Sequence, residues 1–342
     1  MKQRYKIIYI ILKHNLSKQE LVVCFIVLYE DLSMIIRGTR KFSNNQSGFT
    51  ELIKWVENKK ESSLSLHFTL EPTGIYHENF VYFLSSMNYQ VHVVLTKKAK
   101  RYAESLAPNS KTDKLDSKAL GRLGVERNLD VWRPDFPIYR KLKILTRERS
   151  AILKLRTMVN NQLEAMENSA HPNKKSINRH KYLIKEFSEQ IKKIENDIEN
   201  TVNGDVLLKE KLKKIITIPG VGFLTAITII AETDGFALIK SIKQITAYAG
   251  LDVKVRESGK WKGKSKISKT GNVHIRKALY WPAYSSIKYS NTYSTFYERI
   301  RQRKEKSMIA AVAVQRKILG LIFTLWKNDS VYIENYKTTQ AA

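Results

Sequence analysis

The spacing of apolar residues in the first third of the chain predicts an α/β domain. In its clearest run, 64–71, leucine or phenylalanine alternates with a polar residue at every second position, and Glu71 closes the run on the polar side. This alternation is typical of a half-buried strand. Other segments fit the same domain: strands at 6–12, 20–29, 90–95 and, more weakly, 32–42, and helices at 47–59, 75–88 and 112–127. Two prolines within 131–137 mark its end near residue 135.

Residues 136–204 are predicted to form long helices with a heptad repeat. One apolar stripe recurs every seven positions up to a loop at 171–173, and a second stripe with 3-4-3-4 spacing follows it. The stripes are Ile138, Leu142, Leu145, Ile152, Leu155, Val159, Leu163 and Met166, then Ile184, Phe187, Ile191, Ile194, Ile198 and Val202. Two antiparallel helices and an oligomerising coiled coil both explain the pattern, which indicates packing and not chemistry.

From about residue 205 the pattern changes again. The segment Ile216–Phe223 contains Gly220 and Gly222 and precedes an apolar helical run that reaches Glu232. Backbone N–H groups at such a glycine turn can face a phosphate. An ordinary helix–turn–helix corner has the same spacing, so the turn alone does not decide between the two interpretations.

The segment 251–306 is strongly basic, with 15 Lys and Arg against four Asp and Glu. A flexible basic loop, 257–266, leads through Ser268–Asn272 into a helix that carries His274. Phosphate contacts are expected from Lys260, Lys262, Lys264, Lys266, Lys269, Arg276 and Lys277. Aromatic residues follow at Tyr280, Trp281, Tyr284, Tyr289, Tyr293, Phe296 and Tyr297. Cations interleaved with rings suit phosphate contact combined with base stacking, although the core is expected to claim about half of these rings.

Composition narrows the class of partner. The 342-residue chain carries 60 Lys and Arg against 32 Asp and Glu, a formal charge of +28 that favours a polyanion. A membrane is the weaker interpretation, because the longest apolar run, 21–29, has nine residues against the roughly 20 of a spanning helix, and no secretory signal is recognisable. The single cysteine, Cys24, excludes an internal disulfide and a cysteine-based zinc site. These features favour a bacterial-type cytoplasm.

Three carboxylates are candidates for a metal site. Asp113 and Asp116 are three residues apart and share one face if 112–127 is helical, while Glu71 ends a strand. Carboxylates that converge from a strand end and a helix offer the oxygen ligands that magnesium requires. On the residues alone, a solvated helix with neighbouring lysines is the better explanation of Asp113 and Asp116.

Six short motifs, in this order and spacing, resemble those of the insertion-sequence one-ten (IS110) family of bacterial transposases, which includes the Piv-type DNA invertases. They are Glu71-Pro72-Thr73-Gly74, Lys111-Thr112-Asp113-Lys114-Leu115-Asp116, Ile218-Pro219-Gly220-Val221-Gly222, Tyr248-Ala249-Gly250-Leu251, Glu257-Ser258-Gly259 and Ser268-Lys269-Thr270-Gly271-Asn272. The resemblance covers nearly the whole chain. It implies an α/β RuvC-like (RNase H-like) DEDD domain over 1–135, a helical coiled-coil segment over 136–204 and a mostly helical C-terminal transposase domain over 205–342.

The resemblance also implies site-specific DNA recombination. Glu71, Asp113 and Asp116 match the second, third and fourth acids of a tetrad that binds magnesium. Ser258 matches the serine that attacks the DNA backbone and forms a covalent phosphoserine. Relatives use a structured bridge RNA that pairs with donor and target DNA, so the implied partners are DNA, a guide RNA and further copies of the chain in a dimer or tetramer.

Asn15 departs from the family pattern. It stands within Lys13–Glu20 where the first acid is expected, and an amide offers a metal a carbonyl oxygen without negative charge. Asp31 matches that acid poorly. Two alternatives therefore stay open: a metal-dependent nuclease or junction resolvase that uses water, and a decayed copy that binds nucleic acid without cutting it. The rivals of Ser258 are Ser241, Ser265 and Ser268.

Overall fold

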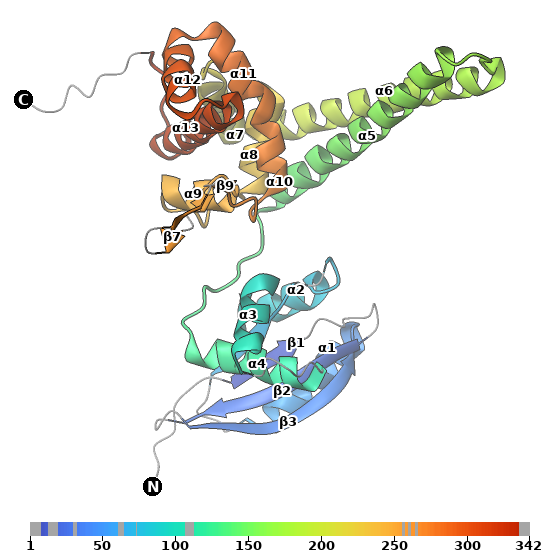
Figure 1. Cartoon of the computed structure of the whole chain (residues 1–342). Coiled ribbons are helices and arrows are strands. Elements are labelled where there is room, and N and C mark those ends of the chain that lie inside the picture. Colours follow the sequence, from blue (N-terminus) through green and yellow to red (C-terminus); the bar gives the residue numbers. More distant parts are fainter. Residues whose placement is uncertain are drawn as a thin grey trace, which may run out of the picture. The chain divides into compact units, whose positions relative to one another are not determined.

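The chain divides into two compact units, residues 1–134 and 135–342, which are described separately (Figure 1). The computed structural model describes residues 8–12, 20–29, 33–60, 65–72, 74–106, 113–254, 257–258, 261–263 and 266–334. Asn15, Asp31, Lys260, Lys264 and Ser265 lie outside these ranges. The side chains of 8–12, Asp113, Lys114, Asp116, Glu257, Trp261 and Lys262 are also outside the description.

The N-terminal unit contains a five-stranded sheet and four helices. Its elements are β1 (Ile8–Leu12), β2 (Glu20–Leu28), β3 (Met34–Ser43), α1 (Gln46–Glu57), β4 (Leu66–Leu70), α2 (Glu78–Ser86), β5 (Gln90–Val93), α3 (Thr96–Leu106) and α4 (Asp113–Glu126). The strand order is β3-β2-β1-β4-β5. β1, β4 and β5 are parallel, whereas β2 and β3 pair antiparallel at one edge. The expected α/β class is therefore present.

Helices cover both faces of this sheet. Phe68 of β4 packs with α1 and α2 in one apolar cluster, and Cys24 of β2 packs with α3 and α4 in another. The sequence pattern predicts a half-buried β4 with a polar face, but Thr69 on that face is fully buried. The correction has a physical cause: strands of a parallel sheet between two helical layers have no solvent face.

The C-terminal unit is helical, with one small β arm. Its elements are α5 (Pro137–Glu167), α6 (Lys174–Asn203), α7 (Val206–Ile216), α8 (Phe223–Glu232), α9 (Ile242–Tyr248), β6 (Val253–Lys254), β7 (Glu257–Ser258), β8 (Trp261–Lys262), β9 (Lys266–Ile267), α10 (Val273–Ala278), α11 (Tyr280–Tyr289), α12 (Asn291–Lys304) and α13 (Ser307–Asn328). Within the described chain, α13 alone has the length and apolarity of a membrane span. Its apolar side chains, Val314, Ile318 and Ile322 among them, form the core of this unit, which accounts for that apolarity.

The two heptad stripes form a helical hairpin, α5 and α6, that projects from the rest of the unit (Figure 1). At its base, Leu142, Ile198 and Val202 belong to the same core as α8 and α13. Toward the tip the stripes are less buried, and Leu155 is 42% exposed. The hairpin base and the C-terminal helices consequently share one core, across the expected boundary near residue 204.

This difference in burial along the hairpin predicts a difference in stability. Ile198→Ala should lower the free energy of unfolding of the C-terminal unit by about 2–5 kcal/mol, because it removes fully buried methyl groups and leaves a cavity. Leu155→Ala, in the same heptad pattern, should cost about 0.5 kcal/mol. Urea unfolding followed by circular dichroism measures both. Equal losses would contradict the packing described.

Candidate active site

Glu71 directly follows β4, at the carboxyl end of the strand, and is 9% exposed. It shares a strand face with the buried Thr69, because alternate residues of a strand point the same way. Phe68 and its neighbours face α1 and α2, so the face of Glu71 is the one on which α4 packs. Register pairs Leu12 with Leu70, so β1 ends beside the residue that precedes Glu71.

The helix that carries the two aspartates begins at Asp113 and contacts β1, β2 and β4. By helical position, 113 and 116 fall on the stripe that continues into the buried residues Ser117, Leu120 and Leu123. The backbone therefore places both positions in the first turn, on the sheet-facing side of α4. Among the side chains described, no group of three or more His, Cys, Asp or Glu forms a metal site; those of Asp113 and Asp116 are outside that set.

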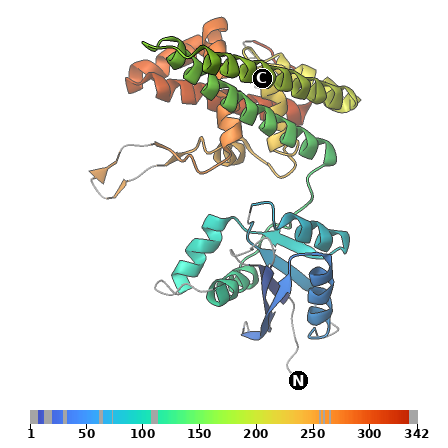
Figure 2. The ribbon, with the colours of Figure 1, turned by 90° about the vertical axis from the view of Figure 1, so that its right-hand side faces the viewer.

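Ser258 lies on a β arm, formed by β6, β7, β8 and β9, that extends from the helices (Figure 2). Two short antiparallel ladders build it: β6 with β9 at the root, and β7 with β8 further out. Ser258 pairs with Trp261 across the outer ladder, and its side chain is exposed. Of the lysines predicted on this arm, Lys266 is exposed and Lys262 is in β8, with its side chain outside the description.

Two glycines lock the root of the arm. Gly250 has a positive φ of 67°, and a Cβ there would lie 2.6 Å from the Gly271 nitrogen. A Cβ on Gly271 would lie 2.2 Å from the Tyr248 carbonyl oxygen. The turns 248–251 and 268–272 thus meet backbone to backbone, and the Arg276 guanidinium donates to the Ala249 and Gly271 carbonyls at 2.8 and 2.9 Å. Arg276, predicted to contact phosphate, is engaged in holding this root.

The described rivals of Ser258 have other bonding roles. Ser268 is buried, and its hydroxyl donates to Asp252 at the root of the arm. Ser241 caps α9 by accepting a hydrogen bond from the Gln244 backbone N–H at 3.2 Å. Within the described part of the chain no hydrogen bond engages the Ser258 hydroxyl. An exposed, unengaged hydroxyl is the one of the three available to a substrate.

Sequence reasoning missed a buried carboxylate behind the root. Glu232, at the end of α8, is 1% exposed. The Arg147 guanidinium of α5 donates to both of its oxygens at 2.6 and 2.8 Å, and the Asn272 amide donates to Oε2 at 2.6 Å. Burial alone would raise the pKa of Glu232, but these hydrogen bonds outweigh it and hold the pKa below its ordinary value. The sequence did contain a signal for this buried acid, because Glu232 directly follows the mostly apolar run 223–231.

Asn272 connects this carboxylate to the arm. Its side-chain oxygen accepts hydrogen bonds from the backbone N–H groups of His274 and Ile275 and so caps α10. The backbone N–H of Asn272 donates to the Tyr248 carbonyl oxygen at 2.7 Å. The Tyr248 hydroxyl in turn donates to the Glu232 carbonyl oxygen at 2.9 Å. One network therefore joins α5, α8, α9 and α10.

The two glycines of the predicted phosphate-binding turn have different surroundings. Gly220 has a φ of 83°, and a Cβ there would lie 2.5 Å from the Ser286 Oγ of α11, so packing alone requires glycine. Gly222 is the N-cap of α8 and has open space around it. Lys269, at a φ of 51°, and Lys277 are both exposed. Gly222, Lys269 and Lys277 remain candidates for phosphate contact.

Comparison with known proteins places this architecture in a class. Residues 16–172 match a DEDD-type IS110 transposase domain described as "Transposase", and residues 212–298 match "Transposase IS116/IS110/IS902 family". The chain is 28% identical over 297 residues to the pilin gene-inverting protein of Moraxella bovis, covering 84% of this chain and 88% of that one. It is 26% identical over 140 residues to the transposase for insertion sequence element IS1111A of Coxiella burnetii, covering 40% of this chain and 38% of that one.

These matches define a DNA-modifying enzyme of the transposase and recombinase class. The chain carries two domains of IS110-family transposases, as its motifs predicted. The DEDD type of domain implies a divalent metal ion. The residues present fit such an ion, because the nearly buried Glu71 and the first turn of α4 share one face of the sheet and offer oxygen donors.

The buried network predicts a pH-dependent loss of stability. Arg147→Met removes two charge-assisted hydrogen bonds from Glu232, and the free energy of unfolding at about pH 7 should fall by about 1–3 kcal/mol. A carboxylate whose folded-state pKa is lowered stabilises the fold above its unfolded-state pKa and loses that contribution as pH falls through the folded-state pKa. The difference from the unaltered chain should therefore shrink below about pH 4.

Arg149→Met is the matched control for this variant. Arg149 also lies on α5 and pairs with Glu195 at 2.6 Å, but both groups are partly exposed, so the loss should stay below about 1 kcal/mol. Urea unfolding of the three proteins at about pH 7 and about pH 3 makes the comparison. Equal losses for the two variants, or a pH-independent loss for Arg147→Met, would show that Glu232 does not carry the effect.

Proposed function

We propose that this chain is an insertion-sequence transposase that cuts and rejoins DNA through a covalent phosphoserine at Ser258. The observation that carries the proposal is the presentation of Ser258: an exposed hydroxyl far out on a braced basic arm, whereas Ser268 and Ser241 are engaged in the fold. Family membership supplies the reaction class, and the arm supplies the nucleophile.

The reaction is a double exchange of phosphoester bonds. The Ser258 Oγ attacks the scissile phosphorus, the bond from phosphorus to the 3′-oxygen breaks, and that oxygen leaves with a proton as a free 3′-hydroxyl. The 3′-hydroxyl of the partner strand then attacks the phosphoserine and releases Ser258. Each step forms one phosphoester as it breaks another, so no external energy source is required.

Glu71, Asp113, Asp116 and the amide oxygen of Asn15 would hold the divalent ion, which we take to be magnesium. When bound, the ion would neutralise charge on the phosphate and lower the barrier to attack by a serine that is a weak nucleophile at neutral pH. The acids belong to the N-terminal unit and Ser258 to the C-terminal unit.

The proposal extends to architecture and partners. The strand order β3-β2-β1-β4-β5 supports a RuvC-like fold for 1–135, and the heptad hairpin supports a coiled coil for 136–204, followed by a transposase domain over 205–342. The charge of +28 supports simultaneous binding of DNA and a structured guide RNA. We propose a dimer or tetramer acting in a bacterial cytoplasm.

Asn15 favours a second candidate function. With one carboxylate fewer, the chain could act as a water-using nuclease or as a copy that binds DNA without cutting it. The water-using nuclease would leave no protein–DNA adduct and would not need Ser258. The binding copy would show steep salt dependence and no cleavage with magnesium.

A covalent adduct tests the proposal. The purified full chain is incubated with magnesium, the flanking transcript and element-end DNA labelled on the 3′ side of the scissile phosphate, in the segment that stays joined to the serine. The mixture is then run on a denaturing gel. The unaltered chain should give a protease-sensitive adduct that Ser258→Ala abolishes. Asn15→Asp should raise its yield on the order of tenfold, since it restores a negative ligand.

Ser265→Ala is the control variant, because it removes another hydroxyl from the same basic segment of the sequence, 257–266. An adduct that survives Ser258→Ala and vanishes with Ser265→Ala would overturn the assignment of the nucleophile. Cleavage without any adduct would establish the water-using nuclease, and binding without cleavage in both the unaltered chain and Asn15→Asp would establish the binding copy.

A further inference from the structure

The aromatic residues of 280–297 divide into two sets. Tyr293 and Tyr297 are buried in the core of the C-terminal unit. Trp281 is 74% exposed and Tyr289 is 72% exposed, and both lie on α11. Core packing explains the first set. It does not explain a tryptophan with three quarters of its surface in water, because tryptophan is usually largely buried.

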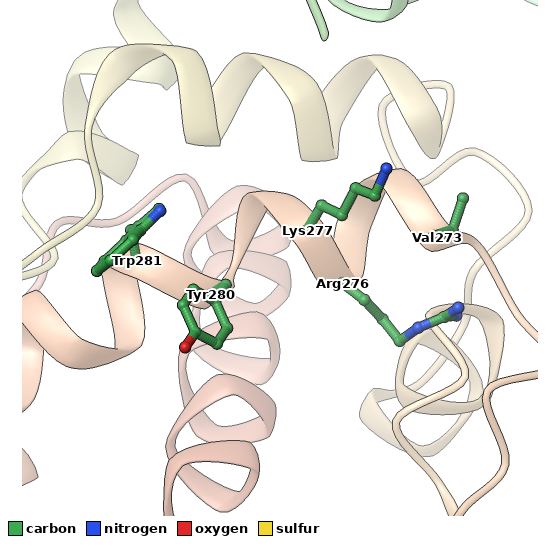
Figure 3. Close-up of a pocket in the computed structure, with 5 residues that line it drawn as sticks. All are labelled: Val273, Arg276, Lys277, Tyr280 and Trp281. Carbon is green, nitrogen blue, oxygen red and sulfur yellow. The ribbon is translucent and has the colours of Figure 1, made fainter. Parts of the chain in front are cut away.

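Trp281 forms one wall of an open pocket of about 410 Å³ on α10 and α11. Val273, Lys277 and Trp281 follow one another at four-residue spacing and project from the same side of the ribbon (Figure 3). Arg276 and Tyr280 complete the lining and project from the other side in that view. Lys277 and Trp281 thus present an ammonium group and an indole ring on the same side of these helices, one helical turn apart along the chain.

Neighbouring rings brace the indole. Tyr280 meets Trp281 edge-on, with ring centroids 5.2 Å apart and planes at 84°, and Tyr284 lies 6.5 Å from Trp281. Edge-to-face contacts of this kind are favourable for aromatic pairs and restrict the inner ring without covering it. A braced and exposed ring is a stacking platform that loses little conformational entropy when a planar ligand binds.

The charges around the pocket select the ligand. None of the five lining residues is acidic, and none of the ion pairs among the described residues involves Lys277. Arg276 is committed to the Ala249 and Gly271 carbonyls, so Lys277 is the cation available to a ligand. A planar platform beside one uncommitted ammonium group matches a nucleobase followed by its phosphate.

We propose that this pocket binds an unpaired nucleotide, with its base stacked on Trp281 and its phosphate against Lys277. A base within a duplex is already stacked on both faces, so the platform selects a single-stranded segment, of DNA or of RNA. The pocket follows the root of the serine arm directly along the chain, since α10 begins at Val273. The proposal rests on the proposed function for its choice of nucleic acid as ligand.

Photo-crosslinking tests the unaltered chain directly. Oligonucleotides that carry 5-iodouracil, in a deoxyribose and a ribose series, are irradiated with the full chain and the crosslinked peptide is identified by mass spectrometry. We expect the crosslink at Trp281, with single strands and not with a matched duplex. A crosslink confined to other segments, or equal crosslinking of the duplex at Trp281, would overturn the proposal.

Binding measurements add the energetic test. By fluorescence anisotropy, Trp281→Ala should weaken binding of labelled oligothymidylate or oligouridylate by about 5- to 150-fold and leave duplex binding unchanged. Trp281→Phe should recover most of the loss. Lys277→Gln should reduce the slope of log K against log salt concentration by about 0.7, because one phosphate contact is lost.

Tyr289→Ala is the matched control, because Tyr289 is equally exposed on the same helix but does not line the pocket. An equal loss with Tyr289→Ala, or a change in oligomeric state with oligonucleotide binding intact, would overturn the proposal. A loss in one series only assigns the site to that nucleic acid. The two proposals can be refuted separately. If the chain forms adducts but Trp281→Ala leaves single-strand binding unchanged, only the nucleotide pocket is refuted. If single-strand binding depends on Trp281 but no adduct forms, only the recombination chemistry is refuted.

Discussion

The C-terminal unit is organised around the buried carboxylate of Glu232. Removing a carboxylate from water is costly unless charged partners and hydrogen bonds replace the lost hydration. Here Arg147 and Asn272 fill that role, and they come from segments 125 residues apart in the chain. The fold can keep Glu232 ionised only by bringing the base of the hairpin and the start of α10 to the end of α8. The main effect of the Glu232 carboxylate is therefore to determine how α5, α8 and α10 are arranged, and its contribution to stability is secondary.

The contacts around Glu232 also fix the position of the arm that carries Ser258. Asn272 donates a hydrogen bond to Glu232 and also caps α10. It is the last residue of the turn that packs against Gly250. Any displacement of α5 would pull on Arg147 and hence on the root of the arm. A rigid root that carries one short ladder further out, β7 with β8, suits the proposed nucleophile, which must be directed at a phosphate and yet adapt to its final position.

Periodicity predicted the elements whose burial is one-sided and regular. The heptads of α5 and α6 are of this kind, because a period of 3.5 residues determines which side chains face the core. The alternation also located the strand that precedes Glu71, but it wrongly predicted a polar solvent face, since Thr69 is buried. The helix α3 was missed, since Ala99 is its single buried residue and the rest of its sequence reads as a polar loop. The family motifs singled out Ser258, and the structure adds that, among the described residues, no hydrogen bond engages its hydroxyl.

Long-range polar contacts were beyond any local pattern. Arg276 sits in a basic run and was expected to contact phosphate, yet the backbone carbonyls of Ala249 and Gly271 surround its guanidinium. Nothing in its neighbours predicts this, because the need for a donor arises only when the turns at Gly250 and Gly271 come together and leave carbonyls to be satisfied. The same reasoning applies to Thr69, whose burial depends on α3 and α4 covering the second face of the sheet.

The substitution at Asn15 changes the charge of the proposed metal site by one unit and leaves its sign unchanged. Glu71, Asp113 and Asp116 contribute three negative charges, which still exceed the two positive charges of a magnesium ion. An amide oxygen keeps the coordination number while weakening the attraction, and ligand charge is one of the quantities that set the affinity of such sites. In the proposed site we therefore expect a loss of affinity, which a higher concentration of metal would offset, because the amide oxygen of Asn15 would still serve as a ligand.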